Sequence, residues 1–181
     1  MCSLGLFGWL PAGKDGKTTS NAGLWDQRLA LQWVQKYAAL FGGDADRVTV
    51  MGVGSGAASI LYQTASFDGE RDLPFRQAII VDPMWDIDPP ADTLEITQGF
   101  VQKFQGKAGP GINELDRVPS EDLRDANRAV VRDSPIGKYT FGPVLDTQLV
   151  ASHPLAVLKG GLPHSEGQVP APRWPPRHGS G

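Results

Sequence analysis

The sequence predicts an α/β fold, in which a mainly parallel β-sheet carries helices on its faces. Apolar, β-branched segments with strand character alternate along the chain with segments of helical periodicity. In addition, one strand-like segment runs through a glycine-rich turn directly into a helix, in RVTVMGVGSGAASILYQ at residues 47–63. Alternation of this kind places successive strands parallel to one another.

The first part of the chain contains one expected strand and one long expected helix. Residues 3–9 are apolar, short and followed by Pro11, which is typical of a buried strand. After a polar loop, residues 24–40 show helical periodicity and end at Gly42. Four large side chains recur every fourth residue in this helix, and we expect them to form a stripe that packs in the core: Trp25, Leu29, Trp33 and Tyr37.

Two further expected strands lie on either side of the second helix. Residues 47–53 are β-branched and apolar, residues 55–64 have small residues that open a helix, and residues 77–82 are apolar again. We therefore expect residues 3–9, 47–53 and 77–82 to be neighbouring, mainly parallel strands, with the long helix on one face of the sheet.

The later part of the chain is less regular. Residues 93–105 have a helical pattern, Ser120 resembles a helix cap followed by acidic residues, and residues 139–150 suggest a short strand, a turn and a second short strand. Residues 161–181 are rich in Pro and Gly and have few aliphatic side chains, which predicts a disordered tail. The expected domain therefore comprises residues 1–160.

Composition excludes several classes of function. The 181 residues carry a formal net charge of −3, so a nucleic-acid partner is not expected, and no apolar run is long enough to span a membrane. The first residues lack a basic segment, so no signal peptide is expected. Cys2 is the only cysteine and the histidines lack zinc-ligand spacing, so neither a metal site nor a cofactor is expected.

A long segment carries a family resemblance. NAGLWDQRLALQWVQKYAALFGGDADRVTVMG, at residues 21–52, resembles the type-B carboxylesterase and lipase family, which includes the cholinesterases, and is most similar to its fungal members. PFRQAII, VPSEDL and FGPVLD resemble later family segments in the expected order. The resemblance covers about residues 3–160 and implies a partial α/β-hydrolase fold. It also implies hydrolysis of a small carboxylic ester, in a family whose members are often secreted.

The resemblance places the family's G-E-S-A-G turn on residues 52–56, and there the sequence departs from it. Gly54 takes the position of the nucleophilic serine, and Val53 takes that of the neighbouring acidic residue. Glycine adopts the strained conformation of this turn at little cost, so we expect Gly54 to keep the turn and remove the nucleophile. Ser55 then holds the position whose backbone N–H lines the oxyanion hole. The sequence thus offers no confident catalytic residue.

The other parts of the catalytic machinery are not recognisable either. The family's glycine-rich oxyanion loop corresponds to sequence before residue 1, and its triad acid and histidine would follow FGPVLD, where the resemblance is lost. Glu166 matches the acid only as part of an acid–glycine dipeptide. The three histidines are expected to be exposed loop residues rather than general bases: His153, His164 and His178.

Other polar residues have simpler interpretations. Asp26 and Arg28 suggest a structural ion pair at a helix start. Three acidic residues close together lack the spacing of a calcium loop and are expected to be solvated: Asp82, Asp86 and Asp88.

Three hypotheses about function remain at this point. The first is a truncated, non-catalytic member of the family. The second is an active ester hydrolase, either alone through Ser55 or as part of a longer chain. The third is a protein-interaction module built on the hydrolase fold, with an unknown partner. Gly54 favours the first and the third. The substrate and the cellular compartment stay open.

Overall fold

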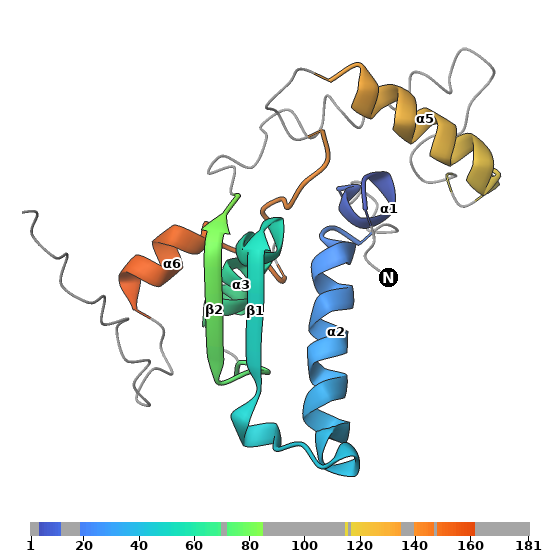
Figure 1. Cartoon of the computed structure of the whole chain (residues 1–181). Coiled ribbons are helices and arrows are strands. Elements are labelled where there is room, and N and C mark those ends of the chain that lie inside the picture. Colours follow the sequence, from blue (N-terminus) through green and yellow to red (C-terminus); the bar gives the residue numbers. More distant parts are fainter. Residues whose placement is uncertain are drawn as a thin grey trace, which may run out of the picture.

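The computed structural model describes residues 4–11, 19–69, 72–84, 115, 117–134, 140–146 and 148–161 (Figure 1). Two strands and several helices form in this part of the chain, and they are, in order, α1 (Leu6–Trp9), α2 (Ala22–Tyr37), η1 (Ala38–Phe41), η2 (Ala45–Arg47), β1 (Thr49–Gly54), α3 (Ser55–Thr64), η3 (Ser66–Gly69), β2 (Gln77–Pro83), α5 (Ser120–Arg132) and α6 (Pro154–Gly160).

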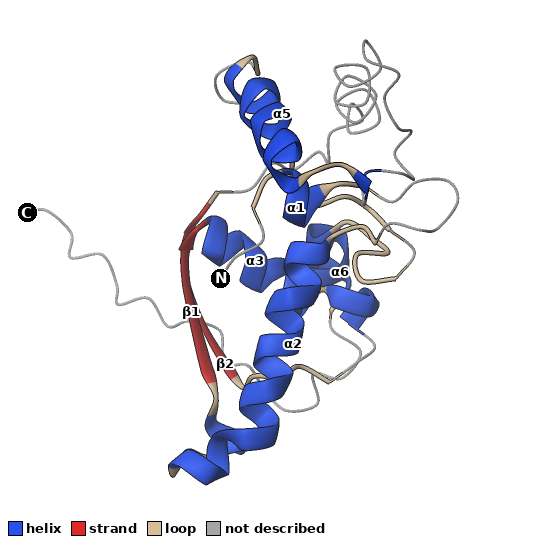
Figure 2. Ribbon diagram, turned by 90° about the vertical axis from the view of Figure 1, so that its right-hand side faces the viewer, coloured by secondary structure: helices blue, strands red, loops and turns tan. Residues whose placement is uncertain are grey.

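The two strands confirm the centre of the expected fold. β1 and β2 pair in parallel, with Thr49 opposite Gln77 and Met51 opposite Ile79. α3 packs directly against both strands, and Figure 2 shows α2 on the same side of the sheet as α3. This β–α–β unit is the α/β arrangement that the sequence predicts, reduced in the described residues to a two-stranded sheet.

The prediction of a strand at residues 3–9 is wrong. Leu6–Trp9 form one turn of helix, α1, preceded by Gly5 with a φ of 56°. Leu6 is buried and its backbone N–H donates to Oδ1 of Asn127 in α5, at 2.9 Å. A short apolar segment has no periodicity that separates a strand from a buried helical turn, and here the contacts with α5 determine the outcome.

The long helix forms as expected, but the large side chains in its stripe are not all buried in the core. Trp25 packs edge-on against Phe67 and is partly buried. Trp33, however, is 52% exposed and Leu29 is 66% exposed, so the expectation of core packing is wrong for them. Trp33 instead contacts the rings of Tyr37 and Phe41 along the surface. The reason is that α2 reaches beyond the outer edge of β1, where no described strand lies beneath it.

The buried apolar residues form two clusters. The first contains Leu6, Leu115 and Phe141 and is completed by residues of α5. The second is made by Leu24, Tyr62, Leu149 and Val150. Trp9 is partly buried and packs against both clusters. Segments far apart in sequence therefore hold the described parts together.

The later elements differ from the expectations in three ways. Residues 140–146 and 148–150 form turns and extended loop rather than two short strands, because Asp146 Oδ1 accepts from the N–H groups of Gln148 and Val150. Ser120 is the first residue of α5 and makes no capping bond, and Pro119 takes the cap position. α6 was not expected. The helix expected at 93–105 and the tail at 162–181 lie outside the described residues.

Candidate functional site

The turn that resembles the family's elbow lies where β1 meets α3. β1 ends at Gly54, and α3 begins at the next residue, Ser55. Gly54 has a φ of 59° and a ψ of −121°, a combination that side chains of L-residues rarely adopt. The chain therefore makes the sharp strand-to-helix reversal with a glycine at its strained position.

A second glycine allows α3 to fold back against the strand. A Cβ atom on Gly52 would lie 2.5 Å from the backbone carbon of Gly56 and 2.6 Å from the backbone nitrogen of Ala57. Both neighbours are main-chain atoms and cannot rotate away. Gly56 is different, because a Cβ placed there would meet nothing within 4 Å. The close approach therefore requires glycine at position 52 only.

β2 ends beside the elbow in an irregularity that the sequence did not indicate. Val53 lies opposite Val81, whereas Gly54 lies opposite Pro83, so β2 contains one extra residue at this point. That residue is Asp82, which has a φ of 44°. Asp82 thus lies in β2, within the strand expected at residues 77–82, and its side chain is exposed; Asp86 and Asp88 lie outside the described residues.

The extra residue in β2 leads directly to Met84, which covers the elbow. The Met84 N–H donates to the Gly54 carbonyl oxygen at 3.0 Å. Its side chain lies 3.7 Å from where a Cβ of residue 54 would stand, which is ordinary van der Waals contact. A side chain at position 54 is therefore strained by the backbone and not blocked by a neighbour.

The candidate catalytic side chains do not come together at the elbow in the described residues. Ser55 is exposed in the first turn of α3. His153 caps α6, and its Nδ1 accepts from the Leu155 N–H at 3.2 Å. The segment before His153 lies at the other end of α3, where the Leu149 carbonyl accepts from the Phe67 N–H. His164, His178 and Glu166 lie outside the described residues.

Arg28 has a structural role, with partners that the sequence did not indicate. It is buried in the middle of α2, and its guanidinium donates to the Gln63 carbonyl, the Ser66 hydroxyl and the Asp72 carbonyl. These bonds join α2 to the C-terminal end of α3. The Gln63 side chain in α3 adds a second connection to α2, because it donates to the Leu24 carbonyl at 2.7 Å. The position of α3, and with it that of the elbow, therefore depends on α2.

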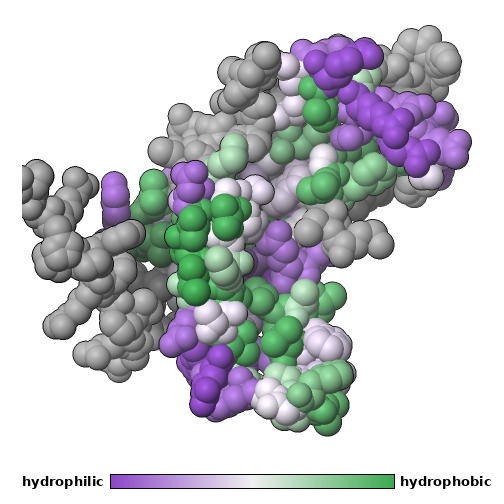
Figure 3. All heavy atoms as spheres, in the orientation of Figure 1, coloured by the Kyte–Doolittle hydropathy of each residue, from purple (hydrophilic) through white to green (hydrophobic). Residues whose placement is uncertain are grey.

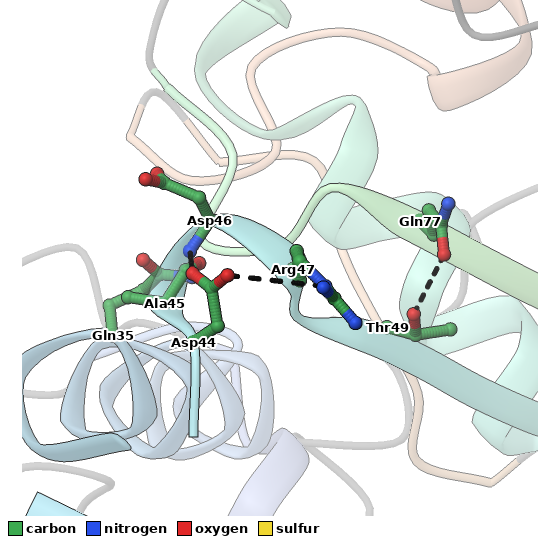
Figure 4. A network of polar contacts seen from close by, with 7 residues as sticks. All are labelled: Gln35, Asp44, Ala45, Asp46, Arg47, Thr49 and Gln77. Atoms are coloured by element: carbon green, nitrogen blue, oxygen red, sulfur yellow. Dashed lines mark hydrogen bonds and ion pairs between the residues drawn. The ribbon is translucent and has the colours of Figure 1, made fainter. Parts of the chain in front are cut away.

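A polar network fixes the other end of β1 (Figure 4). Gln35 in α2 donates to the carbonyl oxygens of Ala45 and Pro74, which precede β1 and β2. Asp44 accepts from the Asp46 N–H, and Thr49 contacts Gln77 across the two strands at 3.0 Å. The start of both strands is thus tied to α2.

The described residues show neither a metal-binding cluster nor a membrane-spanning helix. The described residues contain no group of three or more His, Cys, Asp or Glu side chains that could share a metal ion. No helix in these ranges has the length and apolar character needed to cross a bilayer.

Known proteins are similar to this chain in sequence and in fold. The model of the carboxylesterase family matches residues 3–169. The chain is 39% identical over 163 residues to the carboxylesterase patB of Aspergillus clavatus. The matched region covers 87% of this chain and 29% of that protein. The chain is also 39% identical to the Penicillium expansum protein of the same name, over 86% of this chain and 28% of the other.

Solved structures agree with these relatives. A thermophilic PNB esterase superposes with a TM-score of 0.75 at 27% identity, over 88% of this chain and 33% of its own. The juvenile hormone esterase of Manduca sexta superposes with a TM-score of 0.72 at 29% identity, over 87% of this chain and 31% of its own. The chain thus spans about 30% of the length of the proteins that it matches. On this evidence the chain belongs to the carboxylesterase family, and its elements are part of an α/β-hydrolase fold.

Proposed function

We propose that this chain is a non-hydrolysing member of the carboxylesterase family. It keeps the turn called the elbow but lacks the nucleophilic side chain. The observation that carries the proposal is Gly54, which has a strained backbone conformation at the end of β1, the position that the family resemblance implies for the nucleophilic serine. Glycine has no atom that can attack an ester carbonyl. The sharp turn is kept and the reacting group is absent.

Ser55 is a weak substitute for the missing nucleophile. A serine needs a base within hydrogen-bond reach to become nucleophilic. The described histidine, His153, uses its Nδ1 to cap α6 and belongs to the segment beside the far end of α3. The backbone N–H of Ser55 is left with the role of an oxyanion donor, and a small carboxylic ester is the ligand class that the family implies.

Labelling with a fluorophosphonate probe and turnover of a short-chain p-nitrophenyl ester test this proposal. We expect no labelling and no turnover above buffer, because oxyanion donors without a nucleophile give little acceleration. Gly54→Ser alone should remain unlabelled, since no base lies beside the elbow in the residues that the structure describes. Labelling that disappears in Ser55→Ala would overturn the proposal and make Ser55 the nucleophile.

A further inference from the structure

We propose that Met84 covers the elbow and determines whether an uncharged acyl group can reach a side chain at position 54. This inference rests on the proposed function, because it adds a second obstacle to hydrolysis at the same turn. The first obstacle is the missing nucleophile, and the second is the thioether side chain that lies over its position. The two obstacles can be tested separately.

Met84 is the described residue that position 54 faces. A Cβ atom on Gly54 would lie 3.7 Å from both Cγ and Sδ of Met84 and would meet no other described atom within 4 Å. An attacking atom would be bonded to this Cβ, and the carbon that it attacks must come within about 3–3.5 Å of it. Cγ and Sδ of Met84 compete with that carbon for the space beyond position 54. A small side chain therefore fits under Met84, whereas an acyl group reaches it only when Met84 moves aside.

The backbone of β2 holds Met84 beside the elbow. The Met84 N–H donates to the Gly54 carbonyl oxygen at 3.0 Å. The extra residue in β2, Asp82, brings Pro83 opposite Gly54, whereas in a regular register Asp82 itself would lie there. The bulge therefore brings Met84 one position closer to the turn. The cover depends on the pairing of two strands and not on a loose loop.

The Met84 side chain can uncover the elbow without any change in the backbone. Methionine is unbranched and has three rotatable bonds, so its thioether adapts to its surroundings more easily than a branched side chain does. Leucine has a similar volume, and Met84→Leu should therefore keep the cover. Met84→Ala removes both atoms that contact position 54, Cγ and Sδ, and should open it.

The surroundings of the cover favour an uncharged acyl group. Figure 3 shows hydrophobic residues gathered over β1 and β2, the two strands that lead to the elbow. Val53 and Val81 are the paired residues directly before the turn and the bulge. The charged residue of β2 is Asp82, whose carboxylate disfavours an anion but not a neutral ester. A short, uncharged acyl chain is therefore the ligand class that fits beneath Met84.

Thiol labelling measures access to position 54. Gly54→Cys places a single thiol at the elbow in a chain whose one native cysteine is removed by Cys2→Ser. Benzyl methanethiosulfonate, an uncharged reagent, transfers its benzylthio group to the thiolate and releases methanesulfinate. A pH series separates the rate constant of the thiolate from the fraction of thiol that is ionised. We expect this rate constant to rise about tenfold or more in Met84→Ala and to change little in Met84→Leu or in the control Met51→Ala on β1.

A measurement on the unmodified chain keeps the test decisive if Gly54→Cys does not fold. We expect a nuclear Overhauser effect between the Gly54 Hα protons and the side-chain protons of Met84, assigned with the help of Met84→Leu. Its absence, or equal labelling rates with Met84 and Met84→Ala, would overturn this inference and leave the proposed function untouched. Fluorophosphonate labelling of Ser55 would instead overturn the proposed function without changing the Overhauser effect or the ratio of thiol rates.

Discussion

The close approach of α3 to β1 gives a sharp prediction for the substitution Gly52→Ala. The new Cβ would lie 2.5 Å from a backbone carbon, nearly 1 Å short of the 3.4 Å at which ordinary contact begins. Since the atoms that it meets are all main chain, either the strand or the helix must shift. Overpacking of this kind costs about 1–3 kcal/mol, and the rigid neighbours place Gly52→Ala at the upper end of that range. For a chain of this length, that corresponds to a fall in the melting temperature of about 2–4 °C per kcal/mol.

Gly56→Ala is the matched control, because the same side chain is added four residues away in the same turn. Its Cβ meets nothing, and alanine is favoured over glycine in a helix by about 0.5–1 kcal/mol. Pulse proteolysis across a urea series measures both variants in dilute protein. We expect Gly52→Ala to lower the urea midpoint and Gly56→Ala to keep or raise it. If Gly52→Ala proved as stable as Gly56→Ala, the close packing of strand and helix at the elbow would be refuted.

Three further substitutions test the contacts around the site. Gly54→Ser should fold but lose about 1–3 kcal/mol, because its φ of 59° is strained and its Cβ meets only Met84; an unchanged urea midpoint would show that the turn relaxes without cost. Asn21→Ala should lose about 2–4 kcal/mol, because the Asn21 side chain bonds both backbone groups of Val144 and the residue has a φ of 57°. Asn21→Gly relieves only the backbone strain and also lacks the side chain that bonds Val144. Hydrogen exchange at the Val144 amide should therefore be fast in both variants, and a protected amide would argue against the bond. Arg28→Met should cost about 2–4 kcal/mol through the buried acceptors that it leaves, whereas Lys36→Met on the surface of the same helix should cost little; equal urea midpoints would contradict the role given to Arg28.

The parts of the fold that could be predicted are those with strong local signals. The helix of α2 follows from its periodicity and its glycine stop, and β1–α3–β2 follow from the β-branched runs and the glycine-rich turn. Residues 3–9 have no such signal, because a four-residue turn of helix and a short buried strand share the same composition. Their conformation depends on Asn127 and Leu115, more than 100 residues away.

At the site, the assignment of Gly54 to the nucleophile position stays a prediction from the family resemblance, and the structure adds what surrounds this residue. The resemblance of residues 21–52 to the family continues without a break into the turn, and this is what assigns Gly54 to that position. The extra residue at Asp82 and the resulting position of Met84 could not be foreseen, since a bulge depends on the pairing of two strands. Likewise, the sequence did not indicate the hydrogen bonds of Arg28 to α3 and to the segment after it, whereas the ion pair of Asp26 and Arg28 stays a prediction.

The division of the buried residues into two clusters has a consequence for how the chain opens. Two segments contribute to both clusters. α1 does so through Trp9, which packs against each of them. The segment from 140 to 150 does so through Phe141 in the first cluster and through Leu149 and Val150 in the second. Among the described residues, the α5 half and the sheet half are therefore connected through these two segments rather than through one continuous cluster. We therefore expect α5 to separate in a sub-global opening that leaves β1, α3 and β2 protected, at a lower free energy than global unfolding.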